Sequence, residues 1–182
     1  DEAEAQRAAQ AYMELLDSIA HNQLEAYVSI KLTQLGLDIS REVCTANLRL
    51  ILEKAKSVGN FVRIDMESSR YTEITIRIFE EHLADYFGHL GIVIQSYLYR
   101  SEADVARLSA MGCNIRLCKG AYMEPPEIAF PRKRDVDRNY IELMEMLLVS
   151  PGYTAIATHD SRMINHARRF IAEKEISQEK YE

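Results

Sequence analysis

Strand-like and helix-like segments alternate along the whole chain, and this alternation limits the fold more than any other feature of the sequence. The helix-like segments begin with residues 3–20, where apolar side chains recur at helical spacing. Short apolar runs predict five strands, at residues 26–32, 61–66, 91–97, 114–119 and 154–160. Strands separated by helices are typical of a parallel α/β sheet, and both a doubly wound sheet and a (β/α)8 barrel satisfy this order.

The predicted helices have recognisable start and stop signals. Ser40 is expected to cap the second helix, which ends at Gly59. Ser101, followed by Asp104, predicts the start of the fourth helix, which Gly112 stops. No linker or low-complexity segment interrupts the pattern, so residues 1–182 are predicted to form a single domain.

Charged and polar side chains share one face of four of the predicted strands. Between residues 61 and 66, for example, Val62 and Ile64 alternate with Arg63 and Asp65. The polar side of these strands comprises Ser29, Lys31, Arg63, Asp65, Glu67, Gln95, Arg116 and Cys118. A doubly wound sheet should be apolar on both faces, whereas a barrel packs its aliphatic face on helices and points the other face inward. We therefore predict an incomplete (β/α)8 TIM-type barrel with about five of its strands.

Charges that point into a barrel are costly unless a ligand or a partner side chain compensates them. The polar residues gather toward the carboxyl ends of the strands, where barrel enzymes hold their active sites. A competing interpretation has Lys31 and Asp65 solvated at the strand ends and Arg63 paired with Glu67. The repetition of the asymmetry in four strands favours a barrel lined for a ligand.

Two sets of residues indicate the chemistry of that ligand. The first combines cations with hydrogen-bond donors and suits an extended anionic ligand with phosphates. Its members are Arg116, Lys133, Thr158 and His159. The second set, Lys31, Asp65 and Tyr122, suits a smaller zwitterionic molecule.

Charge and composition exclude several other classes of protein. The net charge is −6 and no basic stripe is present, which argues against nucleic acid as the main partner. No apolar run approaches the roughly 20 residues that span a bilayer. Cys44, Cys113 and Cys118 lack paired spacing and are expected to be reduced thiols. No histidine pair has the spacing of a metal site.

Several motifs together resemble one known family. They are "SIKLTQLGLD", "VRIDME", "IVIQSYLYRSEAD", "IRLCKGAYMEP", "KRDVDRNY" and "ATHD". In this order and spacing they are similar to the proline dehydrogenase family. The resemblance implies an FAD-dependent (β/α)8 barrel that oxidises L-proline to Δ1-pyrroline-5-carboxylate by hydride transfer to the flavin. It also implies a quinone as electron acceptor, a cytoplasmic location and peripheral association of the parent protein with the inner face of the membrane.

The resemblance also implies roles for individual residues. Those expected to contact FAD are Asp65, Gln95, Arg116, Lys119, Gly120, Ala121, Arg132, Lys133, Thr158 and His159. Those expected to contact proline are Lys31, Asp65, Ala121 and Tyr122. Arg116 is expected near flavin N5, and Lys31 is expected to pair with the proline carboxylate. The residues with a catalytic role are then Lys31, Asp65, Arg116 and Tyr122.

The chain is shorter than the roughly 250 residues typical of this barrel. In the family, a strand with a Leu-Gly-Glu motif precedes the segment seen here. Two further strands follow, with a final helix whose paired arginines bind the proline carboxylate. The 182 residues are therefore expected to be a central fragment without these parts. Turnover by the fragment alone is expected to be weak or absent.

Two other functions satisfy part of the pattern. Lys31 and Lys119 each end a predicted strand, as the nucleophile of a Schiff-base aldolase or lyase would, and Arg116 would then bind a substrate phosphate. Alternatively, the chain is a catalytically silent fragment that acts as a structural or interaction module. A lysine adduct trapped by borohydride would favour the aldolase, and bound flavin would favour the dehydrogenase.

Overall fold

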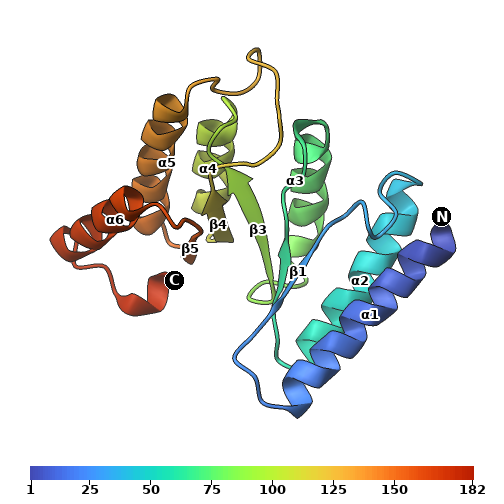
Figure 1. Cartoon of the computed structure of the whole chain (residues 1–182). Coiled ribbons are helices and arrows are strands. Elements are labelled where there is room, and N and C mark those ends of the chain that lie inside the picture. The colour runs from blue at the N-terminus through green and yellow to red at the C-terminus, as the bar shows by residue number, and fades with distance from the viewer. The chain divides into compact units, whose positions relative to one another are not determined.

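Five parallel strands and six α-helices alternate in the computed structural model, which describes all 182 residues. The strands form one sheet in the order β1-β2-β3-β4-β5 (Figure 1). The chain divides into two compact units, Asp1–Ile92 and Val93–Glu182. The predicted alternation of helices and parallel strands is therefore confirmed, although each strand is shorter than its apolar run in the sequence.

The first unit contains two of the strands, the start of a third and three helices. These elements are α1 (Glu2–His21), β1 (Val28–Ile30), α2 (Arg41–Ser57), β2 (Val62–Ile64) and α3 (Ser69–Leu83). In Figure 1, α1 and α2 lie side by side and pack on each other. As predicted, Ser40 caps α2, because its hydroxyl oxygen accepts a hydrogen bond from the Val43 N–H at 3.1 Å.

Strand register in the first unit separates aliphatic from polar residues. Val28 of β1 pairs with Val62 of β2, and Ile30 pairs with Ile64. All four aliphatic side chains are buried, whereas Ser29, between Val28 and Ile30, is only partly buried. Burial therefore alternates with the predicted period of two in β1, whereas in β2 Arg63 is buried as fully as Val62 and Ile64.

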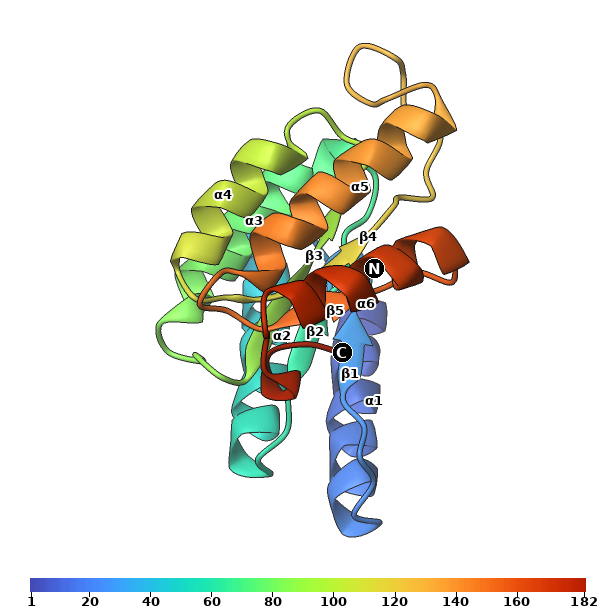
Figure 2. The same ribbon diagram turned by 90° about the vertical axis from the view of Figure 1, so that its left-hand side faces the viewer.

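The second unit begins within β3 and contains three further helices. Its elements are β3 (Leu90–Gln95, which starts in the first unit), α4 (Ser101–Ala110), β4 (Asn114–Cys118), α5 (Lys133–Leu148), β5 (Thr154–Ile156), α6 (Ser161–Glu173) and a 3-10 turn (Gln178–Lys180). In both Figure 1 and Figure 2, α5 lies between α4 and α6, and it packs on both. β4 and β5 pair in parallel, with Leu117 opposite Ile156.

The start of α4 agrees with the prediction, because Ser101 is the first residue of the helix. No side chain caps this end. The Ser101 hydroxyl donates a hydrogen bond to the carbonyl oxygen of Gln95, and the Asp104 carboxylate accepts from the Arg100 guanidinium at 2.6 Å. Both side chains therefore have partners that a local sequence pattern does not reveal.

None of the helices combines the length and the hydropathy that crossing a bilayer requires. The core of each unit is aliphatic and lies between its helices and its strands. Leu48, Ile51 and Ile76 are fully buried in the first unit, and Leu108 and Leu143 in the second. This packing fixes the strand ends, where the polar residues singled out by the sequence lie.

Candidate functional site

Most of the predicted site residues lie at or just beyond the carboxyl end of a strand. In the first unit, Lys31 follows β1 and Asp65 follows β2. In the second unit, the residues at strand ends are Gln95, Lys119, Gly120, Ala121, Tyr122, Thr158 and His159. Arg116 lies within β4, and Arg132 and Lys133 lie at the start of α5. This is the end of a parallel α/β sheet at which ligands bind.

An ion pair joins the ends of β1 and β2. The Lys31 amine donates to the Asp65 carboxylate at 3.1 Å, and 43% of the lysine side chain remains exposed. Two residues further on, the Thr33 hydroxyl donates to Glu67 at 2.6 Å, and the Thr33 N–H donates to the same carboxylate at 3.2 Å. Lys31 and Asp65 are partly solvated at the strand ends, as the competing interpretation expected, and they also form an ion pair that a ligand can reach.

Arg63 is buried within the first unit instead of pairing with Glu67. Its guanidinium lies over the rings of Tyr27 and Phe61, with centroid distances of 5.2 and 5.0 Å. The two rings meet edge to face at 5.5 Å. Cation–π contact with two rings, worth about 1–2 kcal/mol per pair when desolvated, offsets part of the cost of burying this cation.

Tyr12 of α1 also approaches the Lys31–Asp65 pair, and sequence reasoning did not assign it to the site. Its hydroxyl donates to the Gln34 amide oxygen at 2.9 Å. Burial raises the pKa of Tyr12, the charge of Lys31 lowers it and the charge of Asp65 raises it. In the sequence, Tyr12 is one of the apolar side chains that recur at helical spacing in residues 3–20, and such a pattern gives no sign of nearby charges.

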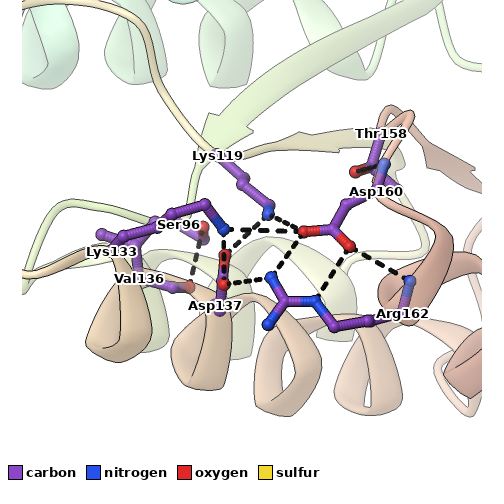
Figure 3. Close-up of polar contacts among 8 residues, drawn as sticks. All are labelled: Ser96, Lys119, Lys133, Val136, Asp137, Thr158, Asp160 and Arg162. Carbon is purple, nitrogen blue, oxygen red and sulfur yellow. Dashed lines mark hydrogen bonds and ion pairs between the residues drawn. The ribbon is translucent and has the colours of Figure 1, made fainter.

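A second cluster of charges lies in the second unit and joins β4, α5 and α6 (Figure 3). The Lys119 amine donates to the Asp137 carboxylate at 2.6 Å and to the Asp160 carboxylate at 2.9 Å. Lys133 donates to Asp137 at 2.6 Å. Arg162 donates to Asp137 at 3.0 Å and to Asp160 at 2.9 Å. We call these five residues the Lys119 network.

The protonation states in the Lys119 network follow from its geometry. Burial by itself would lower the pKa of Lys119, but hydrogen bonds with Asp137 and Asp160 outweigh burial and raise it. Burial would likewise raise the pKa of Asp137, but Lys119 and Lys133 lower it. Arg162 and Lys119 hold the pKa of Asp160 far below its ordinary range. A lysine held charged in this way is poorly suited to act as a Schiff-base nucleophile, which requires the neutral amine.

The network contains residues that the sequence had grouped differently. Lys119 and Lys133 were expected at an extended anionic ligand, and both contact Asp137. Asp137, Asp160 and Arg162 had received no role. Asp137 and Asp160 lie inside the motifs "KRDVDRNY" and "ATHD". The motifs therefore marked both residues as candidates, but the sequence could not show which side chains they contact.

Arg132, although adjacent to Lys133, does not belong to the network. Its guanidinium donates to the buried carboxylate of Asp135 at 2.6 Å, and Arg138 donates to the other oxygen of the same carboxylate at 2.6 Å. Arg132 and Lys133 are both largely exposed on their outer sides. These two cations therefore remain accessible from solvent at the start of α5.

The backbone just after β4 has a shape that only glycine allows. Gly120 has a φ of +105°, and a Cβ atom there would lie 2.4 Å from the Tyr97 ring. Ala121 and Tyr122, which follow, are exposed. Close packing of Gly120 on Tyr97 fixes the position of the chain between Lys119 and these two exposed side chains.

The remaining predicted residues differ in exposure. Gln95 is buried, Arg116 and Thr158 are partly buried, and His159 is exposed. The Thr158 hydroxyl oxygen accepts a hydrogen bond from the Asp160 N–H at 3.1 Å, which links Thr158 to the start of α6.

In the second unit, these residues fit an extended anionic cofactor. The unit has solvent-accessible cations at Arg132 and Lys133, a glycine backbone at Gly120, and an exposed imidazole at His159 after β5. Accessible cations, close backbone approach and hydrogen-bond donors are what a ligand with phosphates requires. FAD has this chemistry.

Comparisons with known proteins agree with the motifs. The sequence model of the family described as "Proline dehydrogenase" matches residues 1–182. Proline dehydrogenase 1 of Bacillus subtilis (strain 168) is 39% identical over 181 residues, which cover 100% of this chain and 60% of that protein. Proline dehydrogenase of Deinococcus radiodurans is 37% identical over 174 residues, which cover 93% of this chain and 56% of that protein. The chain thus spans about 60% of the length of the Bacillus relative.

Solved structures with the same arrangement are proline utilization A proteins. The protein from Bdellovibrio bacteriovorus, inactivated by N-propargylglycine, has a TM-score of 0.88 and 26% identity, covering 100% of this chain and 24% of that chain. The protein from Corynebacterium freiburgense has a TM-score of 0.84 and 27% identity, covering 99% of this chain and 22% of that chain. The predicted TIM-type barrel class is confirmed by this likeness and by the five parallel strands alternating with helices. Because the family's sequence model spans residues 1–182, the chain belongs to the proline dehydrogenase family.

Proposed function

We propose that this chain provides part of the active site of an FAD-dependent proline dehydrogenase. The reaction would oxidise L-proline to Δ1-pyrroline-5-carboxylate by hydride transfer to FAD, with a quinone as the final electron acceptor. The observation that carries the proposal is the position of the family motifs. Their polar residues lie at or beyond the carboxyl ends of the strands, where parallel α/β enzymes bind their ligands.

The Lys31–Asp65 pair supports a role in binding proline. Lys31 would pair with the proline carboxylate, and its half-exposed amine can reach a ligand without leaving the end of β1. Asp65 would lie beside the proline ring and the flavin. Ala121 and Tyr122, both exposed after β4, would pack on the substrate. An amino acid is a zwitterion, so a cation and a carboxylate side by side suit both of its charges.

The second unit supports a role in binding the cofactor. Gln95, Arg116, Lys119, Gly120 and Ala121 would lie beside the flavin ring. The phosphates and the adenosine would contact Arg132, Lys133, Thr158 and His159. When bound, FAD supplies the two-electron acceptor that no protein side chain provides. The guanidinium of Arg116 would stabilise negative charge that develops near N5, and the binding residues would orient the proline Cα–H bond.

The quinone belongs to the same proposal. A quinone is a membrane lipid, so reoxidation by a quinone would bring the parent protein to the membrane surface and favour peripheral association. For the 182 residues by themselves we expect FAD binding with weak turnover. Lys31 is the one cation of this chain assigned to the proline carboxylate, and a second cation would be needed for tight binding.

An absorption spectrum tests the proposal directly. The purified chain is mixed with FAD, freed of excess cofactor, and then titrated with L-proline without oxygen. Retained flavin bands that bleach with L-proline, but not with D-proline, are expected, and a soluble quinone should restore them. A chain that retains no flavin would contradict the cofactor assignment. Because weak turnover is expected, the bleaching is followed to completion, and flavin that is reduced no faster by saturating L-proline than by D-proline would contradict the substrate assignment.

A further inference from the structure

We propose that Asp137 and Asp160 are positioning residues for Lys119, and that together they keep its ammonium group charged and directed at one fixed point beyond β4. This inference deepens the proposed function, because Lys119 is one of the residues that would lie beside the flavin. Neither carboxylate is assigned to contact the cofactor or proline. Their role would be to determine where the charge of Lys119 lies.

The burial of the two carboxylates makes their contacts with Lys119 strong. Only 11% of the Asp137 side chain and 23% of the Lys119 side chain are exposed. A buried carboxylate that loses its cation is left with an uncompensated charge, so pairs of this kind separate reluctantly. Lys119 lies between both carboxylates, at 2.6 and 2.9 Å, and the two contacts define its direction (Figure 3).

The carboxylates are anchored by their helices, whereas the lysine has a long flexible side chain. Asp160 is the cap of α6 and accepts a hydrogen bond from the Arg162 N–H at 3.1 Å. The helix that carries Asp137 is held to the end of β3, because the Asn139 amide donates to the carbonyl oxygen of Ser96 at 2.6 Å. Four rotatable bonds separate the Lys119 amine from the backbone, so the rigid carboxylates set its position rather than the reverse.

A simpler interpretation is that the network only joins α5 to α6. Arg162 by itself already bridges Asp137 and Asp160, and Lys133 adds a contact with Asp137 at 2.6 Å. Lys133 is 68% exposed, and both it and Arg162 approach the carboxylates from the solvent side. A link between helices therefore does not need Lys119, which approaches from the end of β4. This redundancy indicates that the buried lysine has a purpose other than joining the helices.

The first experiment measures the titration of Lys119 itself. The full chain is labelled with 15N-lysine, and the Lys119 signal is assigned by its loss in Lys119→Met. Lys119 is expected to titrate at a higher pH than the exposed lysines, and its pKa is expected to fall in both Asp137→Asn and Asp160→Asn. Asparagine is nearly isosteric and is itself a good helix cap, so Asp160→Asn should fold even if Asp137→Asn does not.

A matched control separates this effect from general loss of a buried carboxylate. Asp104 of the same unit is also buried and pairs with Arg100 at 2.6 Å, but it has no contact with the Lys119 network. Asp104→Asn should leave the Lys119 titration unchanged. The inference would be overturned if Lys119 in the wild-type chain titrated like the exposed lysines. It would also be overturned if Asp104→Asn changed the Lys119 titration as much as Asp137→Asn and Asp160→Asn do.

The second experiment measures the reduction potential of bound flavin. Removing the positive charge of Lys119 with Lys119→Met should shift the potential to more negative values. If Asp137 holds Lys119 in place, Asp137→Asn releases the ammonium group and should shift the potential in the same direction as Lys119→Met. Simple loss of a nearby negative charge would instead shift the potential to more positive values, because reduction adds negative charge to the flavin. A positive shift in Asp137→Asn, or no shift in that variant, would overturn the inference.

The two experiments distinguish the two proposals. If the wild-type chain retains no flavin, the proposed function fails, and the titration still decides whether the carboxylates control Lys119. If flavin binds and both the titration and the potential are insensitive to Asp137→Asn and Asp160→Asn, the positioning role fails and the proposed function stands.

Discussion

Each unit of this chain has a lysine at the end of a strand, and the two lysines are held in different ways. Lys31 of the first unit pairs with Asp65 at 3.1 Å and keeps 43% of its side chain exposed. Lys119 of the second unit contacts two carboxylates and is mostly buried. A half-exposed ion pair exchanges partners at little cost, whereas a buried network does not. This contrast suits a substrate that enters and leaves in each cycle and a cofactor that stays.

Two glycines with positive φ, one in each unit, differ in how closely they are packed. Gly120 of the second unit is packed on the Tyr97 ring, at a φ of +105°. Gly59 of the first unit also has a positive φ, +67°, but no atom lies within 4 Å of the position of its Cβ. Gly120 is therefore constrained by both its backbone conformation and side-chain packing, whereas Gly59 is constrained by its backbone conformation alone.

The largest expected effect is the loss of stability in Gly120→Ala. Left-handed backbone costs a residue other than glycine about 1–2 kcal/mol, and the clash with Tyr97 adds about 1–3 kcal/mol. We expect the free energy of unfolding, measured with urea, to fall by about 3 kcal/mol. Gly59→Ala should lose only about 1 kcal/mol, because it has the backbone cost without the clash. Equal losses in the two variants would contradict the packing argument.

The next largest effect is the loss of stability on replacing Asp137, compared with that on replacing Asp65. Asp137→Asn should lower the free energy of unfolding by about 2 kcal/mol, because three cations lose a buried charged partner. Asp65→Asn should lower it by less than about 1 kcal/mol, because the pair with Lys31 is partly exposed. Urea unfolding in 0.05 M and 0.5 M salt measures both. If the order of the two losses were reversed, the contrast between the units would be wrong.

A third prediction sharpens the functional side of the contrast and depends on the proposed function. Lys31→Met should raise the KM for L-proline about 10- to 100-fold, since a charge-assisted hydrogen bond is worth about 1.5–3 kcal/mol. Flavin content should not change. Lys54→Met removes a lysine of the same unit that pairs with Asp17 at 3.0 Å, and it should leave the KM unaltered. If the KM of Lys31→Met were similar to that of the wild-type chain, Lys31 would not bind the substrate.

The smallest expected effect is on the pH dependence of stability. Burial opposes ionisation of Asp137, but Lys119 and Lys133 lower its pKa below the ordinary 3.8. As the pH falls, Asp137 is therefore protonated in the unfolded chain before it is protonated in the folded chain. The ionised Asp137 stabilises the fold above about pH 4, and this stabilisation is lost as the pH falls through the folded pKa. For Lys119 the sign is opposite. Its raised pKa stabilises the fold below the ordinary 10.5, and the stabilisation is lost at higher pH.

Urea unfolding at a series of pH values measures this effect. Asp137→Asn should flatten the acid limb of the profile, and Lys119→Met should flatten the alkaline limb. Asp104→Asn should change neither limb through the Lys119 network, because Asp104 contacts Arg100 and Arg107 instead. If the free energy of unfolding fell with the same slope at acid pH in Asp137→Asn and in the wild-type chain, Asp137 would not be held ionised by its partners.

The positions of the strands and of most candidate residues could be predicted because the signals are local. Alternation of Val62 and Ile64 with Arg63 and Asp65 follows from the period of two in a strand. The placement of Lys31 and Asp65 at strand ends follows from the same period and from the parallel order. The start of α4 at Ser101 was predicted for the same reason, whereas the hydrogen bond from Ser101 to Gln95, six residues away and outside the helix, was not.

By itself, the sequence determined the order of the elements, the aliphatic face of the strands and the family to which the chain belongs. Periodicity and motif spacing depend on near neighbours, and they survive whatever the rest of the chain does. Only the tertiary structure decided which charges meet. Lys119 contacts carboxylates 18 and 41 residues away, and Gly120 packs on a ring 23 positions earlier in the chain. Such contacts depend on how helices dock on strands, because side-chain burial and charge pairing are set by packing in three dimensions.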